Sequence, residues 1–208
     1  MKKHIVYIVA FTLLLSCFNK EEEETKSLMT ELLNEKFISG DTLLVSSESF
    51  AGWFEIARLK RCKKENFAEL QNRASYPHPK GNKIIDIFSD EDIRKICKQG
   101  TLSIKFPQEL FPDMVKLISQ KEIDDIYKYK EDYITHSDNT ISGESVFDLQ
   151  TTYYYRFSNP VFLQDYQYAF VYVFSSSLAK DSGSSSLFFY KKKGNKWELI
   201  ISIPLTMA

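Results

Sequence analysis

The stretch Tyr166-Gln167-Tyr168-Ala169-Phe170-Val171-Tyr172-Val173-Phe174 decides the fold. Aromatic residues take every second position from Tyr166 to Phe174, and Ala or Val takes the positions between Tyr168 and Phe174. Side chains of a β-strand alternate between the two faces of its sheet, so both faces of this strand are apolar. A strand that is apolar on both faces is typical of the middle of a sheet. We therefore expect residues 166–174 to form a central strand, with the five aromatic side chains on one face.

The segments next to 166–174 predict the strands beside it. Thr151–Phe157 is rich in aromatic and β-branched residues, which favour strands. We expect Ser158-Asn159-Pro160 to turn the chain between this strand and the central one. After the central strand, residues 175–186 are small and polar, and we expect them to form a loop.

The end of the chain predicts a hairpin. Residues 187–192 and 196–203 flank Gly194-Asn195, a pair typical of two-residue turns between antiparallel strands. Alternation along the last strand predicts that four apolar residues share one buried face: Trp197, Leu199, Ile201 and Ile203. The C-terminal third is thus expected to be an antiparallel meander of about four strands.

The first half of the chain mixes helix and strand patterns. Apolar residues recur at helical spacing over 28–37, and Gly40 supplies a stop. Ser89 with Asp92, and Ser119 with Glu122, have the spacing of helix N-caps. We expect helices over 90–99 and 120–132, short strands over 41–46, 83–88 and 101–106, and connections over 107–114 and 132–144. The predicted fold class is α+β.

The N-terminus has the pattern of a secretory leader. Lys2 and Lys3 precede an apolar run that ends at Leu14-Leu15-Ser16-Cys17. The run is shorter than the ~20 residues that a membrane-spanning helix needs. Leu-Leu-Ser-Cys resembles a bacterial lipobox, which predicts a signal peptide over 1–16 and a lipid anchor on Cys17. An ordinary signal peptide and a signal anchor are the alternatives.

Four glutamates follow the predicted anchor. Lys20 precedes Glu21, Glu22, Glu23 and Glu24. A run of like charges repels itself and favours an extended, solvated chain, so we expect residues 17–26 to be a lipidated acidic tether. The run resembles the surface-export signal of Bacteroidota lipoproteins, which implies display on the outer face of the outer membrane. The alternative is a tether that carries no export signal.

Charge and length limit the functions and the number of domains of the chain after the leader. Loss of Lys2 and Lys3 leaves two fewer than the 27 basic residues against 28 acidic ones, so the formal charge falls from −1 to −3. No basic surplus is present for sequence-independent binding of nucleic acid. The length suits a single domain over 27–208.

Cysteine and histidine are scarce after the leader. Cys62 and Cys97 could form a disulfide in an oxidising compartment, but the position of Cys97 beside Ile93 and Ile96 favours a buried free thiol. The only histidines beyond the leader are His78 and His136, so no Cys/His cluster has the spacing of a zinc site. We expect neither a metal nor a cofactor.

Three C-terminal segments carry a resemblance. They are Phe157-Ser158-Asn159-Pro160-Val161-Phe162, Tyr168-Ala169-Phe170-Val171-Tyr172-Val173 and Gly194-Asn195-Lys196-Trp197-Glu198-Leu199-Ile200. They resemble the C-terminal part of a group of uncharacterised Bacteroidota lipoproteins, over about a third of the chain. Many members carry a Cys-Gly…Cys-Gly loop after the second segment, whereas 175–183 here has no cysteine. The resemblance implies a location and a fold type, and it brings no known activity.

The sequence contains no recognisable catalytic motif. His136-Ser137-Asp138 has the residue types of a hydrolase triad, but the members of a triad meet in space and not as sequence neighbours. No G-x-S-x-G motif is present. Acidic residues at 90–92 and 122–125 are typical of helix N-termini, where the helix dipole favours them. We therefore assign no catalytic residue.

Tyrosines near the central strand are the candidates for ligand contact. Such rings form ordinary sheet cores, but a Tyr hydroxyl that reaches the rim of the sheet could touch a ligand. The candidates are Tyr153, Tyr155, Tyr166 and Tyr168. We expect an outer-membrane or cell-surface lipoprotein that is not an enzyme, is held to the membrane by its lipid, and binds a protein or a glycan. An unfamiliar or degenerate envelope hydrolase is the alternative.

Overall fold

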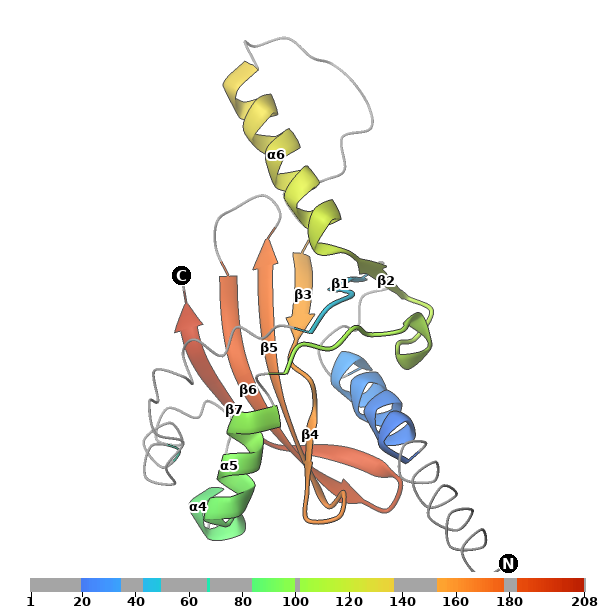
Figure 1. Ribbon diagram of the computed structural model, residues 1–208, viewed down its shortest axis with the longest axis vertical. Helices are drawn as coiled ribbons and strands as arrows, with labels where there is room; N and C mark the ends of the chain where they lie inside the picture. The colour runs from blue at the N-terminus through green and yellow to red at the C-terminus, as the bar shows by residue number, and fades with distance from the viewer. Residues whose placement is uncertain are drawn as a thin grey trace, which may run out of the picture.

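A computed structural model describes residues 20–34, 43–49, 67, 84–99, 102–136, 153–177 and 183–207 (Figure 1). Residues 20–34 are helical and are called the N-terminal helix below. The other helical elements are α4 (Ile84–Ile87), α5 (Asp90–Gln99), the 3₁₀ turn η1 (Gln108–Leu110) and α6 (Gln120–His136). The strands are β1 (Leu43–Ser46), β2 (Val115–Ile118), β3 (Tyr153–Phe157), β4 (Val161–Leu163), β5 (Tyr168–Ser177), β6 (Gly183–Lys193) and β7 (Lys196–Met207).

The described strands form one seven-stranded sheet in the order β2-β1-β3-β5-β6-β7, with β4 also pairing β5. The pairs of β1 with β2 and with β3 are parallel, and the pairs from β3 to β7 are antiparallel. The C-terminal meander and the α+β class are therefore confirmed. The described part of the chain is rich in strand, and most of its strands lie in the C-terminal third.

Strand β5 is central, as its two apolar faces predict. It pairs β3 and β4 along one side and β6 along the other. Ala169, Val171 and Val173 contribute to one core cluster, whereas Phe170 and Tyr172 contribute to another. Tyr166 does not join the aromatic face, because it lies in the turn before β5 and packs against Phe162 of the opposite cluster.

Each face of the sheet has its own helical cover. The N-terminal helix packs Leu28, Met29, Leu32 and Leu33 against the face that carries Val171. Helix α5 packs Ile93 and Ile96 against the face that carries Phe170. Figure 1 shows the two helices on opposite sides of the twisted meander. The apolar alternation of β5 is thus explained by burial on both faces.

A bulge in β7 places its apolar residues on two faces of the sheet and not on one. Phe189 pairs Ile201 but the next residue, Tyr190, pairs Leu199, so Ile200 is an extra residue on β7. One extra residue moves all following side chains to the other face. Trp197 and Leu199 accordingly pack on the face of the N-terminal helix, whereas Ile201 and Ile203 pack on the α5 face. The predicted common face was wrong, although Trp197 is buried.

The expected turn at Ser158-Asn159-Pro160 is a break between two strands that run along the same side of β5. β3 pairs residues 173–177 and β4 pairs residues 168–170, so the chain continues past the break. The buried Ser158 donates its N–H to the Tyr172 carbonyl oxygen at 2.9 Å, and its Oγ accepts the Tyr172 N–H at 3.0 Å. The reversal occurs later, at 164–167.

The Gly194-Asn195 hairpin is confirmed. Lys193 pairs Lys196 across the turn, and Gly194 has φ +60° whereas Asn195 is not among the residues with positive φ. A positive φ at the first central position only is the pattern of a type II′ turn. Glycine takes this conformation without the steric cost that other residues have.

Both predicted helix caps are present. Ser89 and Asp92 exchange bonds at the start of α5, with Ser89 N–H to Asp92 Oδ2 at 2.9 Å and Asp92 N–H to Ser89 Oγ at 3.1 Å. Ser119 and Glu122 repeat the arrangement at α6, at 2.7 and 3.2 Å. Each pair satisfies backbone donors that the first helical turn leaves unpaired. Helix α6 extends to His136, so residues 132–136 are not the expected loop.

Three short segments differ from the expected secondary structure. Residues 84–87 form the helical turn α4 and not a strand, despite the β-branched residues there. Among the described residues of 101–106, only Lys105 makes a bridge, to Glu48. β2 was not expected, and it is formed by pairing with β1. These runs are short, and tertiary contacts override local propensity in such segments.

The described residues of the serine-rich segment 175–186 are strand. β5 continues to Ser177 and β6 begins at Gly183, with Ser175 opposite Ser184 and Ser176 opposite Gly183. Added cross-strand hydrogen bonds explain why residues with low strand propensity extend the pair. Residues 178–182, the middle of the expected loop, lie outside the described part.

The acidic run is helical where we expected an extended tether. Glu21, Glu22 and Glu23 are exposed, but Glu24 and Thr25 are buried. Glu24 forms a salt bridge with Lys192 of β6, whose ammonium neutralises the buried carboxylate. Glu24 stands one helical turn before Leu28, so it lies on the helix face that packs on the sheet. Burial and charge pairing of Glu24 therefore fix the helix to the sheet, whereas Glu21, Glu22 and Glu23 stay exposed.

Candidate functional site

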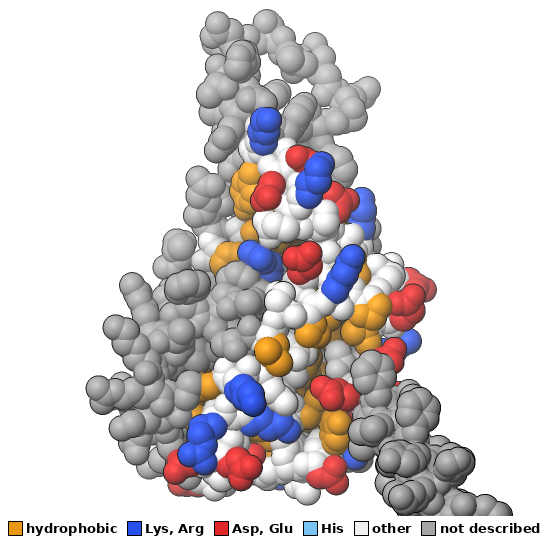
Figure 2. Space-filling view, in the orientation of Figure 1, with side chains coloured by type: hydrophobic (Ala, Val, Ile, Leu, Met, Phe, Trp, Pro, Cys, Tyr) orange, Lys and Arg blue, Asp and Glu red, His pale blue; other side chains and the backbone are white. Residues whose placement is uncertain are grey.

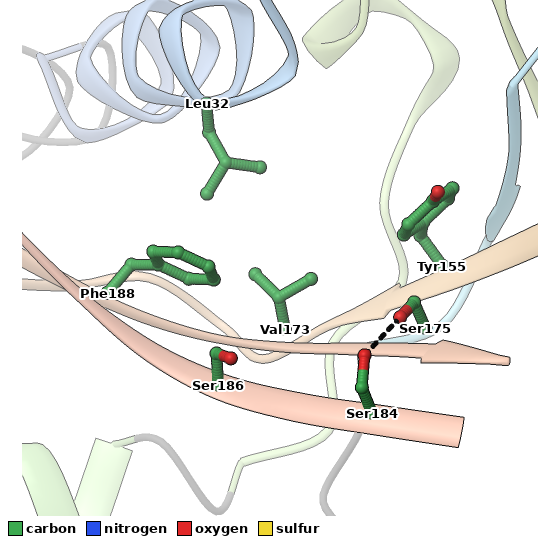
Figure 3. A pocket seen from close by; sticks show the side chains of 7 residues that line it. All are labelled: Leu32, Tyr155, Val173, Ser175, Ser184, Ser186 and Phe188. Atoms are coloured by element: carbon green, nitrogen blue, oxygen red, sulfur yellow. Dashed lines mark hydrogen bonds between the residues drawn. The ribbon is translucent and has the colours of Figure 1, made fainter. Parts of the chain in front are cut away.

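A cavity of about 190 Å³ lies between the N-terminal helix and the sheet. Leu32 of the helix faces Val173 of β5 and Phe188 of β6 across it (Figure 3). The other described lining residues are Tyr155 of β3, Ser175 of β5, and Ser184 and Ser186 of β6. Alternation along each strand brings these side chains to one face. We call this cavity the helix–sheet pocket.

The helix–sheet pocket has an apolar end and a hydroxyl end. Leu32, Val173 and Phe188 form the apolar end, and the Oγ atoms of Ser175 and Ser184 lie 2.8 Å apart at the other (Figure 3). Ser184 is exposed, so the hydroxyl end is the mouth. Each hydroxyl has one donor and two acceptor positions, so the Ser–Ser pair keeps hydrogen-bonding capacity for a ligand.

The described lining of the pocket carries no formal charge at neutral pH. Burial, with a smaller contribution from nearby Tyr153, raises the pKa of Tyr155 to about 12, so its phenol stays protonated. The remaining lining residues are apolar or carry aliphatic hydroxyls. A charged ligand would lose its hydration without gaining a counter-charge there. The pocket therefore favours an uncharged ligand that has both an apolar face and hydrogen-bonding groups.

The structure does not bring the four candidate tyrosines together. Tyr155 lines the helix–sheet pocket, and Tyr153 on the same strand is 50% exposed. Tyr168 packs edge-on against Phe88, with ring centroids 5.4 Å apart, on the other side of the sheet. Tyr166 lies in the β4–β5 turn. Of the four, Tyr155 alone is among the described residues that line this pocket.

Sequence reasoning missed the serines of the pocket. Ser175, Ser184 and Ser186 were expected in a loop, and the structure places them on paired strands. Their spacing held a signal, because Ser184 and Ser186 continue the alternation that puts Phe188 on the same face. Small residues at these positions leave open the volume that larger side chains would fill.

A second, smaller hollow of about 90 Å³ lies at the β4–β5 turn. It is polar, and its described lining comprises Glu21, Lys95, Gln99, Phe162, Asp165 and Tyr166. The Lys95 ammonium donates a hydrogen bond to the carbonyl oxygen of Phe162 at 2.7 Å. On the face shown in Figure 2, acidic and basic side chains of the described residues are interspersed.

The predicted sites on cysteines have separate outcomes. Cys97 is disulfide-bonded, so the expectation of a free thiol there was wrong. The other cysteines of the sequence, Cys17 and Cys62, lie outside the described residues. The lipidation of Cys17 and the possible pairing of Cys62 with Cys97 therefore stay predictions.

The carboxylates considered for acid–base chemistry have structural roles where the structure describes them. Hydrogen bonds from Ser119, backbone first, lower the pKa of Glu122, as expected for a capping carboxylate. Asp125 pairs with Lys121 one turn earlier at 2.7 Å. His136 is the last residue of α6, and Ser137 and Asp138 lie outside the described part. Among described residues, no three His, Cys, Asp or Glu side chains gather to hold a metal ion.

Comparison of the chain with protein-family models, curated proteins and solved structures gives no significant match. The resemblance to the Bacteroidota lipoprotein group stays a prediction from the quoted motifs. Within the described residues, no helix is long and apolar enough to cross a membrane.

Proposed function

We propose that this protein is a lipoprotein of the outer membrane or cell surface, anchored through Cys17, that binds a neutral sugar residue without catalysis. The helix–sheet pocket is the observation that carries the binding function. A pyranose ring has an apolar face of C–H groups and an edge of hydroxyls, which match the two ends of the pocket. The leader and the acidic run support the location. A glycan partner also agrees with the aromatic ring of Tyr155 in the lining of the pocket.

We also propose that residues 27–208 form one domain. The N-terminal helix and the meander share a single buried cluster that includes Leu28, Leu33, Val171 and Trp197. Helix α5 shares a second cluster with the opposite face of the same strands. Contacts of this kind through the middle of the sheet are typical of one cooperative unit.

The anchor is tested by Cys17→Ser. This variant loses the sulfur that would carry the lipid, so we expect it to leave the membrane fraction or to remain unprocessed. Ser16→Ala is the matched control, because it keeps a small residue before the cysteine and should fractionate as the wild type does. A Cys17→Ser protein that is processed and bound to membranes normally would contradict the proposed anchor.

The pocket is tested by Ser186→Phe, which fills the space between Phe188 and the mouth. We expect neutral oligosaccharides to give ligand-observed NMR saturation transfer with the detergent-solubilised wild type, and this variant to lose it. Ser103→Phe places the same ring at an exposed position away from the pocket and should keep binding. Binding that survives Ser186→Phe would show that the sugar binds elsewhere. Failure of all neutral sugars to bind would contradict the proposed ligand class.

A further inference from the structure

The first described residue of the N-terminal helix is held by the β4–β5 turn. Lys20 places its ammonium 3.3 Å from Asp165 Oδ1 and 4.4 Å from the centroid of the Tyr166 ring. The ion pair is exposed, so its charge attraction alone is weak. The cation–π contact with Tyr166 adds a second interaction at the same ammonium group.

The turn that holds Lys20 has an unusual backbone. Gln164, Asp165 and Tyr166 have φ values of 50°, 53° and 64°, in the left-handed region that residues other than glycine seldom adopt. Gln164 donates its amide to the Ile87 carbonyl oxygen at 2.9 Å and to Asp92 Oδ2 at 3.3 Å. Such a conformation persists where surrounding contacts determine it. Here the turn contacts the N-terminal helix on one side and the α4–α5 segment on the other.

A second contact fixes the helix one turn later. Glu24 pairs with Lys192 of β6, and both side chains are largely buried. The Lys192 N–H donates to the Gln167 carbonyl oxygen at 2.9 Å, which joins β6 to the end of the same turn. The start of the described helix, the β4–β5 turn and the tip of the β6–β7 hairpin therefore form one end of the molecule. We call it the clasp end.

The chain between the clasp end and Cys17 is short. Lys20 is three residues after Cys17. Because a fully extended chain spans at most about 3.6 Å per residue, these residues reach no further than about 11 Å. A lipid on Cys17 would therefore hold the clasp end close to the membrane surface.

The mouth of the helix–sheet pocket lies far from the clasp end. Leu32, which faces the pocket, is twelve residues beyond Lys20, and a helix of that length spans about 18 Å. Ser175 is seven residues beyond Tyr168 on β5, and a strand of that length spans about 23 Å. Figure 1 shows that the N-terminal helix and β5 run from the clasp end toward the end that carries α6.

We propose that the clasp end is a membrane-facing surface that rests on the lipid headgroups, and that it orients the helix–sheet pocket away from the membrane. This inference rests on the proposed lipidation of Cys17. Charge does not supply the orientation, because the exposed Lys191 and Lys196 at this end are offset by Glu21, Glu22 and Glu23. The short chain between Cys17 and Lys20, and the contacts of Lys20 with Asp165 and Tyr166, supply the orientation instead.

The orientation can be measured by energy transfer to the membrane. Full-length acylated protein is reconstituted into vesicles of phosphatidylethanolamine and phosphatidylglycerol that contain an acceptor lipid. A donor fluorophore is attached through a noncanonical amino acid, either at Asn195 in the hairpin tip or at Ser184 in the pocket mouth. We expect transfer from position 195 to be several-fold greater than from position 184, and the difference to persist in high salt.

The matched control is a flexible Gly-Ser spacer inserted after Phe18. The spacer leaves the fold and the anchor unchanged but lengthens the reach, so the difference between positions 195 and 184 should shrink. Equal transfer from the two positions without the spacer would overturn the inference, and so would a difference that salt abolishes. Protein that does not bind the vesicles at all would overturn the proposed anchor and this inference together. Bound protein with equal transfer would overturn the inference alone.

Discussion

Trp197 is the largest fully buried side chain that the structure describes. Its ring packs against Phe162 at a centroid distance of 5.7 Å, and Lys192 places its ammonium 5.5 Å from the ring centroid. Truncation of a buried aromatic ring leaves a cavity and costs about 3–5 kcal/mol. We expect Trp197→Ala to lower the free energy of unfolding by this amount in a denaturant titration. Trp197→Phe should lose less, and a Trp197→Ala protein as stable as the wild type would place the ring in solvent.

Glu24 and Lys192 form a largely buried pair, with side chains 12% and 24% exposed. Removal of one partner leaves the other charge buried without compensation, which costs on the order of 3 kcal/mol. We expect Glu24→Ala to reduce the free energy of unfolding by about this amount, whereas Glu23→Ala at the exposed neighbour should change it by at most ~0.5 kcal/mol.

A double substitution tests whether the loss of stability comes from an uncompensated charge in the Glu24–Lys192 pair. Substitution of both residues, Glu24→Met with Lys192→Met, removes the uncompensated charge and should recover most of the loss. Equal stability of Glu24→Ala and Glu23→Ala would contradict the docking of the acidic run on β6. It would favour the extended tether that the sequence pattern predicts.

Among the elements, β7 depends on its bulge. Ile200 is the extra residue that lets Trp197 face the N-terminal helix while Ile201 faces α5. Deletion of Ile200 would restore regular alternation and force one of these sets out of its core. We expect the deletion variant to unfold at a much lower temperature than the wild type, in a circular dichroism melt. Ile200→Val keeps the bulge and should melt close to the wild type.

Some elements could be predicted from the sequence because local signals agree with tertiary packing. The alternation of 168–174, the Gly194-Asn195 turn and the caps at Ser89 and Ser119 all point to what the structure contains. Each depends on groups within a few residues of one another. In such segments the backbone conformation and the side-chain contacts favour the same structure.

Other elements depend on partners distant in the sequence. The four residues of β2 are a strand because β1 lies beside them, and the break at Ser158 is stabilised by Tyr172 of β5. The bulge at Ile200 leaves no mark on a sequence that alternates through it. The candidate site has the same limit: Tyr155 was predicted as a ligand contact, but Leu32 and the pocket serines meet it only in the folded sheet.

At the scale of the whole molecule, the helical acidic run changes how export is tested. Substitution of Glu21, Glu22 and Glu23 by Ala spares the buried Glu24 and so should leave the fold intact. If the run is an export signal, we expect this variant to be lipidated yet shielded from external protease in intact cells. Lys121→Ala, an exposed charge change on α6, is the control and should remain sensitive to protease. A triple variant as sensitive to protease as the wild type would show that the acidic run is not needed for export.

The proposed location, the short reach to the clasp end and the outward direction of the pocket all depend on the anchor at Cys17. Mass spectrometry of the N-terminal peptide, taken from protein purified out of its own membranes, tests the anchor directly. We expect the mature chain to begin at Cys17 and this residue to carry a thioether-linked diacylglyceryl group. A mature chain that begins elsewhere, or a Cys17 without lipid, would contradict the proposed anchor.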